Sequence, residues 1–550
     1  MHKNKKKYLY LLIGIPIAMF LFVGAVDSVF FKINKSFEIF GELFKEISTG
    51  YVEEVDPEDL VRDAIEGMLN NLDPYTIYMD ESETDDVDMI TTGSYNGLGF
   101  TVAIRDEMMT VTDVMDDFPA QKSGIRIGDR LYKIDTTVII NSNAGELRKY
   151  TKKPSGTKID IWVLRDGLED TLHLNVTIEE INMKNVSYSS IIRDSIGYIK
   201  LDRFSRSSTQ EVTDALNKLK RTGKLNGLIL DLRDNPGGLL ESAVGICELF
   251  VQPKSVIVST KGRNSRNDRI YKSNQAPLAP DLPLAVLING SSASASEILA
   301  GAIQDLDRGI IVGEKSYGKG LVQSVYDLPY NAALKITTSK YYIPSGRSIQ
   351  KINYSRKKVM GEDTIEFFTK NGRKVEELNG IMPDSSVKMK AGTYFIQDLI
   401  ANDLFFNFAN RYASKIKVLP KDFDINQKIL DEFNKFVDEQ EYFFQTRIVT
   451  RIDDLMELIE KEKLNHSLKD KLKNIQKDVK AEEKDLMNKQ KSDVSKFLKL
   501  EILRRFKTQH DMITYSIEDD EYINTAISLL YPKQYRKILA IEDTSGTKRN

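Results

Sequence analysis

A run of serines, Ser291 to Ser296, stands between an apolar segment and a helix-like segment in "NGSSASASEILAGAI", residues 289–303. A serine hydroxyl attacks a carbonyl carbon when a neighbouring base removes its proton. The preceding residues, "LPLAVLIN", predict a buried strand, and the following residues predict a helix. The free N–H groups and the positive dipole end of that helix would stabilise an oxyanion. Serine is also a preferred N-cap, and location alone favours the cap over a nucleophile.

Histidine, the usual base for a serine, is scarce in this chain. There are four histidines: His2, His173, His466 and His510. The first precedes an apolar N-terminal run, the last two lie in a charged helical tail, and His173 lies in an alternating strand that predicts a solvent-facing position. A Ser-His-Asp triad is therefore poorly supported. The residues 290–294 also lack the closing glycine of the α/β-hydrolase nucleophile turn.

Lysine replaces histidine as a base where burial leaves its amine neutral. Lys319 follows a predicted strand in "EKSYGKGLVQSVYDL" and stands between Gly318 and Gly320, which allow close approach of the backbone. Gln323, four residues further, shares a face with the lysine in either a helix or a strand. Its neutral amide would orient the amine without adding a counter-charge. Taken alone, Lys319 is better interpreted as a surface loop lysine.

The surrounding elements would bring such side chains together. From about residue 190 to 345, apolar strands alternate with helices, which predicts an α/β layer architecture with a largely parallel sheet. Catalytic groups gather where the carboxyl ends of such strands meet helix starts. Residues 86–180 contain short β-rich runs separated by glycine turns and predict a small β-rich domain. Residues 31–85 and 391–550 have helical patterns; the second region predicts a helical appendage or oligomerisation element.

Composition excludes several classes of protein. A chain of 550 residues predicts three or four domains, and 41% hydrophobic with 29% charged residues is ordinary globular composition. The net charge of −3 gives no reason to expect nucleic acid as the main partner. The single cysteine, Cys247, excludes an intramolecular disulfide and is expected to be a buried thiol. Because no His/Cys/Asp cluster has metal-ligand spacing, we expect neither a metal nor a cofactor.

The N-terminus predicts export. Basic residues precede an apolar run from Tyr8 to Val26, whose 19 residues are enough to span a bilayer. The lysines would stay in the cytoplasm, so the body would lie on the extracytoplasmic, periplasmic side of the cell envelope. Residues 23–25 are an alternative signal-peptide cleavage site, which would release the body into the periplasm. A retained anchor is the favoured interpretation.

Two motifs together resemble a known family. "SSASASEI" followed by "SYGKGLVQ" resembles the carboxyl-terminal processing proteases, also called tail-specific proteases, which are exported Ser-Lys endopeptidases. The resemblance implies that Ser294 is the nucleophile, that Lys319, 25 positions later, is the base, and that Gln323 supports the base. It also implies a structural or orienting role for Asp305. The resemblance covers roughly residues 35 to 390, and the last 160 or so residues fall outside it.

Other segments carry the same resemblance. "LILDLRDNPGGLL" resembles the strand and turn that complete the oxyanion hole, which implies the backbone N–H groups of Ala295 and of Gly237 or Gly238. "YVEEVDPEDLVRDAIEGMLNNLDPYTIYM" resembles the family's N-terminal helical region, and "YYIPSGRSIQ" and "GIMPD" resemble later landmarks of its core. One position departs from the pattern: Asn379 precedes "GIMPD" where a glycine is common.

"YNGLGFTV" and "FPAQKSGIRIGDRLYKID" resemble a PDZ domain. Such a domain binds an extended peptide by adding it as a strand to a sheet edge. Its glycines permit the turn that aims N–H groups at a terminal carboxylate, and its apolar side chains line a pocket for the last residue. The residues expected to bind the peptide are Gly97, Leu98, Gly99 and Phe100.

The expected fold is a multidomain α/β chain with a ClpP/crotonase-like protease core. The expected domains are an N-terminal anchor or signal peptide (1–30), a helical region (31–85), a PDZ domain (86–180), a Ser-Lys protease core (181–390) and a helical extension (391–550). The expected function is cleavage of exported proteins near their C-termini, after PDZ recognition of a free, apolar tail. Further partners expected are an activator or adaptor protein and a second copy of the chain bound through helical regions.

Two other functions remain open. A membrane-tethered PDZ adaptor on an inactive protease-like core would be expected to have lost at least one of Ser294, Lys319 and Gln323, and all three are present. A penicilloyl Ser-Lys enzyme is suggested by "SIQK", residues 348–351, which fits S-x-x-K. That short pattern arises easily by chance, and neither S-D-N nor K-T-G is present.

Overall fold

A computed structural model of the chain describes residues 29–541, apart from residues 82–91, 140–146, 148–152, 355–357, 360–364, 378, 389–391, 441, 443, 445 and 484. The chain forms two compact units, one of Met1–Glu81 with Gln323–Thr337 and the other of Ser82–Val322 with Thr338–Asn550. The predicted membrane segment, Tyr8 to Val26, lies outside the described residues. Within the part of the chain that is described, no helix is long and apolar enough to cross a membrane.

The first unit contains a helix over residues 29–50, α2 (Pro57–Leu69) and β1 (Ile77–Met79). Asp56 begins α2, because its carboxylate accepts the N–H of Glu58 and a proline follows it in the first turn. The region expected to be helical also contains a strand: β1 pairs antiparallel with residues 333–335 of β18 (Ala333–Tyr342). Sequence periodicity missed this strand because it is three residues long and its partner is distant in the chain.

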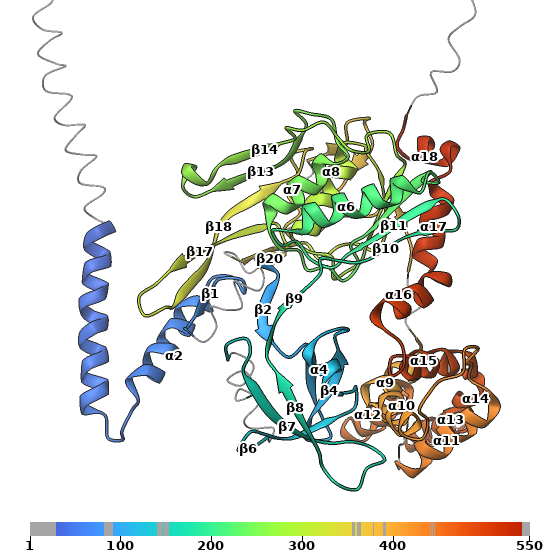
Figure 1. Cartoon of the computed structure of the whole chain (residues 1–550). Coiled ribbons are helices and arrows are strands. Elements are labelled where there is room, and N and C mark those ends of the chain that lie inside the picture. Colours follow the sequence, from blue (N-terminus) through green and yellow to red (C-terminus); the bar gives the residue numbers. More distant parts are fainter. Residues whose placement is uncertain are drawn as a thin grey trace, which may run out of the picture. The chain divides into compact units, whose positions relative to one another are not determined.

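The second unit is built on a six-stranded sheet (Figure 1). Its order is β10 (Val186–Ile192), β11 (Ile196–Leu201), β12 (Gly227–Asp231), β15 (Leu284–Ile288), β16 (Ile310–Gly313) and β23 (Ser385–Ser386). Figure 1 labels the first two strands of this order, β10 and β11. Strand β10 is antiparallel to β11, and every later pair is parallel. All residues of β12 and β15 are buried, which explains why both strands are apolar apart from the last residue of β12, Asp231. The predicted, largely parallel α/β sheet is confirmed.

Helices cover both faces of this sheet. One face packs against α6 (Ser208–Arg221), α7 (Leu240–Glu248) and α8 (Ala295–Asp305) through a large apolar core. The other face packs against the C-terminal helices α17 (Glu521–Leu529) and α18 (Pro532–Ile538). The described residues from 392 to 541 are largely helical as predicted, but their last helices cover the core sheet and do not form a separate appendage. This packing was not predicted, because the apolar residues of this region are scattered in a charged sequence. Two of them, Tyr522 and Ile523, contact strands far away in the chain.

The β-rich region forms a second sheet with the order β3 (Phe100–Arg105), β4 (Met108–Val114), β5 (Arg130–Ile134), β7 (Lys158–Leu164) and β8 (Leu172–Thr177). The short strand β6 (Thr137–Val138) pairs with β5, the helix α4 (Pro119–Lys122) follows β4, and β2 (Ser94–Gly97) pairs with β9 (Glu179–Asn182). Alternate residues of β7 are buried, as the alternating sequence predicts. Strand β3 stands at the end of the strand order and therefore has an edge.

The remaining strands form smaller sheets, which include residues 323–337 of the first unit. Strands β13 (Val256–Gly262) and β14 (Arg269–Lys272) flank the short helix η2 (Ser265–Asn267), β13 pairs with the last residues of β18, and β17 (Leu321–Asp327) also pairs with β18. Two small pairs are β19 (Ile352–Asn353) with β20 (Lys358–Val359), and β21 (Phe367–Phe368) with β22 (Lys374–Val375). The remaining helices are α9 (Tyr394–Ala401), α10 (Leu404–Ser414), α11 (Gln427–Glu439), α12 (Arg447–Lys461), α13 (His466–Glu483), α14 (Leu486–Lys489), α15 (Lys491–Leu503) and α16 (Gln509–Glu518).

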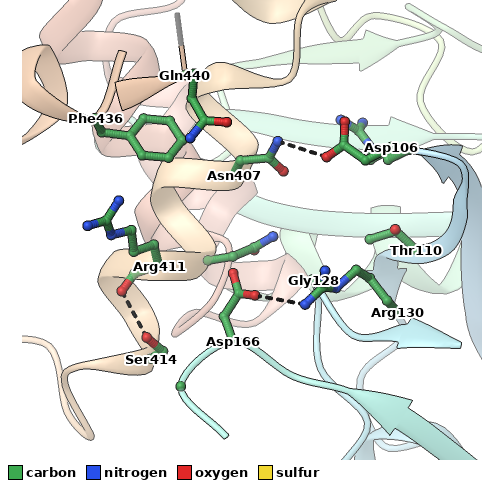
Figure 2. Close-up of a pocket in the computed structure, with 13 residues that line it drawn as sticks. Asp106, Thr110, Gly128, Arg130, Asp166, Asn407, Arg411, Ser414, Phe436 and Gln440 are labelled. Atoms are coloured by element: carbon green, nitrogen blue, oxygen red, sulfur yellow. Dashed lines mark hydrogen bonds and ion pairs between the residues drawn. The ribbon is translucent and has the colours of Figure 1, made fainter. Parts of the chain in front are cut away.

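The β-rich sheet and the helical region meet at a polar cavity of about 450 Å³ (Figure 2). Residues of β3, β4 and β5 line one side, and residues of α10 and α11 line the other. The Asn407 amide lies 3.4 Å from an Asp106 carboxylate oxygen across this joint. On the sheet side, Arg130 pairs with Asp166 at 3.3 Å. The lining does not include the predicted nucleophile or base.

Candidate active site

Ser294 is the N-cap residue of α8 and is half-buried. Its backbone has φ 55° and ψ −113°, a conformation that residues with a side chain rarely adopt. All eleven residues of α8 are buried, so the helix is a rigid support for its first residue. A strained residue held by a buried helix is typical of functional sites, where the surroundings impose the strain.

The other serines of the run have different surroundings. The Ser292 hydroxyl donates to the Leu232 carbonyl at 2.8 Å, and the Ser296 hydroxyl donates to the Asn235 carbonyl at 2.9 Å. Both serines are fully buried, so these hydroxyls join the nucleophile turn to the segment after β12. Ser291 is exposed. The structure therefore separates two structural serines from the half-buried Ser294.

Lys319 lies in the segment between β16 and β17 and is half-buried. A Cβ atom at Gly318, where φ is +91°, would lie 2.8 Å from the Cβ of Lys351. A Cβ atom at Gly320 would lie 2.9 Å from the Gln350 backbone nitrogen. The glycines beside the lysine are therefore required because residues 350–351 pass close to this segment.

A buried carboxylate connects the serine and lysine segments. One oxygen of Glu297 accepts the N–H of Ser294 and the N–H of Lys319, both at 2.9 Å. The other accepts the Gly318 N–H at 2.7 Å and the Ser316 hydroxyl at 2.6 Å. Burial raises the pKa of Glu297 to about 7, against the four donors, which lower it. Our sequence analysis missed this residue, although an acidic residue three positions after an N-cap serine is a capping-box signal.

Gly237 lies beside the nucleophile, and its neighbour Gly238 lies against the Phe204 backbone. A Cβ atom at Gly237, where φ is +101°, would lie 2.9 Å from both the Ser294 Cβ and the Ala295 nitrogen. The Gly237 N–H donates to the Asn235 side chain at 2.9 Å. The Gly237 carbonyl and the Leu239 N–H form the bridge to Phe204. The Gly237 N–H thus already has an acceptor, which favours Gly238 among the two glycines considered from sequence.

The other two site residues predicted in the core lie in different surroundings. Gln323 belongs to the first unit, where its amide donates to the Thr337 hydroxyl at 3.2 Å, which in turn donates to Asp73 at 3.1 Å. Asp305 ends α8, and its carboxylate accepts the Ser345 N–H and an Arg347 N–H, both at 2.9 Å. Through these buried contacts, Asp305 stabilises the end of α8 that is opposite Ser294.

The predicted peptide-binding loop precedes the edge strand β3. Leu98 is buried at 2% exposure and Phe100 is half-buried. The Leu98 carbonyl accepts the Ala120 N–H at 2.8 Å, and the Gly99 carbonyl accepts the Met115 N–H at 2.9 Å. Gly99 has φ +78°, and a Cβ atom there would lie 2.6 Å from Phe118, so a glycine is required. Gly97 precedes this turn as the last residue of β2.

The S-x-x-K residues do not form a comparable site. Ser348 is 5% exposed, and its hydroxyl accepts the Gln350 N–H at 3.3 Å. The segment between β18 and β19 that contains both Ser348 and Lys351 is not helical. The histidines whose side chains are described also have other contacts: His173 pairs with Asp160 at 2.8 Å, and His510 packs against the Tyr188 ring.

Four family models match successive parts of the chain. They are described as the activating protease CtpB N-terminal domain (residues 26–84), the PDZ domain (96–176), peptidase family S41 (195–357) and the probable PDZ-protease C-terminal helical domain (395–530). The S41 match contains the Ser294 and Lys319 segments. The fourth match lies in the region for which the sequence alone offered no resemblance.

Individual proteins agree with these matches. The chain is 39% identical to a carboxy-terminal-processing protease of Bartonella bacilliformis over 316 residues, which cover 57% of this chain and 72% of that protein. It is 35% identical to a carboxyl-terminal-processing protease of Synechocystis sp. over 310 residues, which cover 55% and 72%. A solved structure, the photosystem II D1 C-terminal processing protease, is 25% identical and covers 64% of this chain and 93% of its own, with a TM-score of 0.37. The chain therefore belongs to the carboxyl-terminal-processing proteases, serine-type peptidases of family S41 that carry a PDZ domain.

Proposed function

We propose that the chain is a Ser-Lys endopeptidase that cleaves protein substrates near their C-termini. The observation that carries this proposal is the shared carboxylate of Glu297, which binds the N–H groups of both Ser294 and Lys319. Residues 25 positions apart in the sequence are thereby held by one buried group. The strained backbone of Ser294 and its half-buried position support the role of nucleophile.

In this proposal the Ser294 Oγ attacks the scissile carbonyl carbon, and the neutral amine of Lys319 takes the hydroxyl proton. Lys319 then gives that proton to the leaving amine, and the acyl group stays on Ser294. Water, deprotonated by Lys319, attacks the ester carbon. The bond to the Ser294 Oγ then breaks, Lys319 returns the proton to that oxygen, and the acid is released. Gln323 orients the lysine, and Asp305 holds the far end of α8.

The oxyanion of each tetrahedral intermediate would be bound by the backbone N–H groups of Ala295 and Gly238. Ala295 is the first residue of α8, where N–H groups lack partners within the helix. Gly238 is favoured over Gly237 because the Gly237 N–H already donates to Asn235. Donors fixed in place before the reaction stabilise the developing charge without reorganisation.

Substrate selection would occur at the PDZ sheet. An extended tail would add to the free edge of β3, with its terminal carboxylate at the loop of Gly97 and Gly99 and its last side chain against Leu98 and Phe100. The burial of Leu98 and the half-burial of Phe100 support an apolar last residue. A lining of apolar side chains would give little affinity for a charged one.

The N-terminal region would determine the location and the assembly of the chain. The apolar N-terminal run would anchor the chain, or direct its export, and place the catalytic body outside the cytoplasm. The helix over residues 29–50 exposes large apolar side chains, among them Phe30, Phe31 and Phe37, which supports self-association through the N-terminal region. An activator or adaptor protein remains a further partner in this proposal.

The test is cleavage of an unfolded protein with an apolar C-terminus by the purified full chain in mild detergent. Wild type should cleave it, and Ser294→Ala and Lys319→Ala should lower the rate at least about 10³-fold, the scale at which removal of a nucleophile or base acts. Ser291→Ala is the matched control, because it removes an exposed hydroxyl of the same run. Cleavage that survives in Ser294→Ala would contradict the assignment. Tight binding of the tail without any cleavage would favour the adaptor.

A further inference from the structure

The hydroxyl of Tyr341 lies between the backbones of the proposed nucleophile and base. Its oxygen is 2.6 Å from the Lys319 carbonyl oxygen and 3.2 Å from the Ser294 carbonyl oxygen. Tyr341 is 1% exposed, so water does not compete for these contacts. The Tyr341 N–H also donates to the Gly320 carbonyl at 3.0 Å. One residue of β18 therefore holds the two consecutive peptide units on either side of Gly320.

Tyr341 complements Glu297. The carboxylate accepts the N–H groups of Ser294 and Lys319, whereas the phenol faces the carbonyl groups of the same two residues. A carboxylate supplies two acceptor oxygens and a phenol supplies one proton, so the shorter contact identifies the Lys319 carbonyl as the main acceptor. Glu297 thus binds the N–H groups of both residues, and the Tyr341 hydroxyl binds the Lys319 carbonyl beside that of Ser294.

Tyr341 is itself held in place. It pairs with Thr260 of β13 in an antiparallel ladder, and its ring belongs to the large apolar core under α7 and α8. A hydroxyl on a ring with these contacts has little freedom to move. The position of the Lys319 carbonyl is therefore set by the core of the protein and not by the lysine segment alone.

We infer that Tyr341 is a positioning residue that fixes the separation of the serine and lysine segments for catalysis. The inference rests on the proposed Ser-Lys mechanism. Reaction rates fall about 10²-fold for a misplacement of about 1 Å between reacting groups. Tyr341→Phe keeps the ring and removes the hydroxyl, so the Lys319 carbonyl loses this donor. We expect kcat to fall about 10-fold to 100-fold while KM changes less than about twofold, because the PDZ sheet is untouched.

The pH dependence of activity distinguishes a positioning role from a purely structural role, which would leave this dependence unchanged. A lysine segment that is less firmly held admits more water to the amine, which favours the charged form of the base. The pH of half-maximal activity should therefore rise in Tyr341→Phe. Tyr535→Phe is the matched control: Tyr535 is 9% exposed, and its hydroxyl donates to the Arg308 carbonyl at 2.9 Å, in the contact between α18 and the core.

The experiment measures kcat, KM, the pH profile and the melting temperature for the full chain, Tyr341→Phe and Tyr535→Phe. A fall in kcat with a raised half-maximal pH, and a melting temperature no lower than that of Tyr535→Phe, would support the inference. Unchanged kcat and pH profile would overturn it. A fall in kcat that follows a larger loss of melting temperature, with the pH profile unchanged, would also overturn it. Wild-type cleavage that is absent, or equal to that of Ser294→Ala, would refute the proposed mechanism and this inference with it.

Discussion

Glu297 accepts four hydrogen bonds in a fully buried position, and this combination decides how the residue responds to pH. Its four partners are all donors, so the ionised carboxylate fits them, whereas a protonated carboxyl would add a fifth donor. Burial nevertheless raises its pKa to about 7 from the ordinary value of 4.5. At neutral pH, burial of the ionised carboxylate therefore lowers the stability of the protein, while its hydrogen bonds hold the serine and lysine segments together.

Replacement of Glu297 by glutamine tests this account in two measurements. At one of the two oxygen positions, the amide NH₂ group, itself a donor, would face the N–H or O–H donors that bind Glu297. We therefore expect kcat to fall at least about 10-fold. Glu241→Gln, an exposed residue in the first turn of α7, is the control and should leave kcat unchanged. Wild-type rates in Glu297→Gln would contradict the positioning role.

The stability of the same pair of proteins should depend on pH in a defined direction. The native protein binds the Glu297 proton more tightly than the unfolded chain does. The stabilisation of the native protein that results is complete below pH about 4.5 and is lost as pH rises through about 7. The free energy of unfolding of wild type should thus fall by about 3 kcal/mol relative to Glu297→Gln between pH about 4.5 and 8. Denaturant unfolding at several pH values measures the difference. A constant difference between the two proteins would contradict the burial-raised pKa.

At the scale of elements, the turn after β12 has to approach α8 very closely. A Cβ atom at Gly237 would lie 2.7 Å from the Ala293 carbonyl oxygen and 2.9 Å from the Ser294 Cβ. Gly237→Ala should therefore displace the nucleophile turn and lower kcat about 10²-fold, with a loss of stability of about 1–3 kcal/mol from the strained φ. Gly290→Ala is the control, since a Cβ atom there would meet nothing within 4 Å. Equal kcat values for Gly237→Ala and Gly290→Ala would show that the turn after β12 does not position the nucleophile.

Much of this element structure followed from the sequence because it depends on local patterns. The apolar runs of β12 and β15 and the serine turn before α8 are visible in single segments. The contact of Glu297 with the Ser294 N–H has the local capping-box pattern. The other contacts of Glu297 and those of the Tyr341 hydroxyl were not predictable in this way, because they join residues 19 to 47 positions apart. Strand β1 was missed for a similar reason, since its partner lies in β18.

At the scale of the whole molecule, the PDZ sheet and the helical region are joined within the second unit by polar contacts around the cavity in Figure 2. Gly128, with φ +95°, lies against Asn410: a Cβ atom there would be 2.5 Å from the amide of that side chain. Arg505 donates to the Asn410 oxygen at 2.9 Å, so the amide is not free to turn away. Because the two residues lie so close together, a single methyl group at position 128 should disrupt the contact between the PDZ sheet and the helical region.

Gly128→Ala should therefore loosen the joint, and Gly124→Ala should not. Gly124 has a similar φ of +89°, but a Cβ atom there would meet nothing within 4 Å, so it controls for backbone strain. Limited proteolysis between residues 114 and 130 and in α10 should be faster in Gly128→Ala than in Gly124→Ala. Identical cleavage patterns would show that the contact with Asn410 does not hold the two regions together.

If Ser294 is a nucleophile activated by Lys319, its hydroxyl should react faster with an electrophile than that of an ordinary serine. The most direct measurement is the reaction of the folded full chain with a fluorophosphonate, followed by mass spectrometry of the resulting peptides. The account predicts an adduct on Ser294 in wild type, and labelling at least about 10²-fold slower in Lys319→Ala, since the hydroxyl then lacks its base. An adduct on another serine, or undiminished labelling of Ser294 in Lys319→Ala, would contradict it.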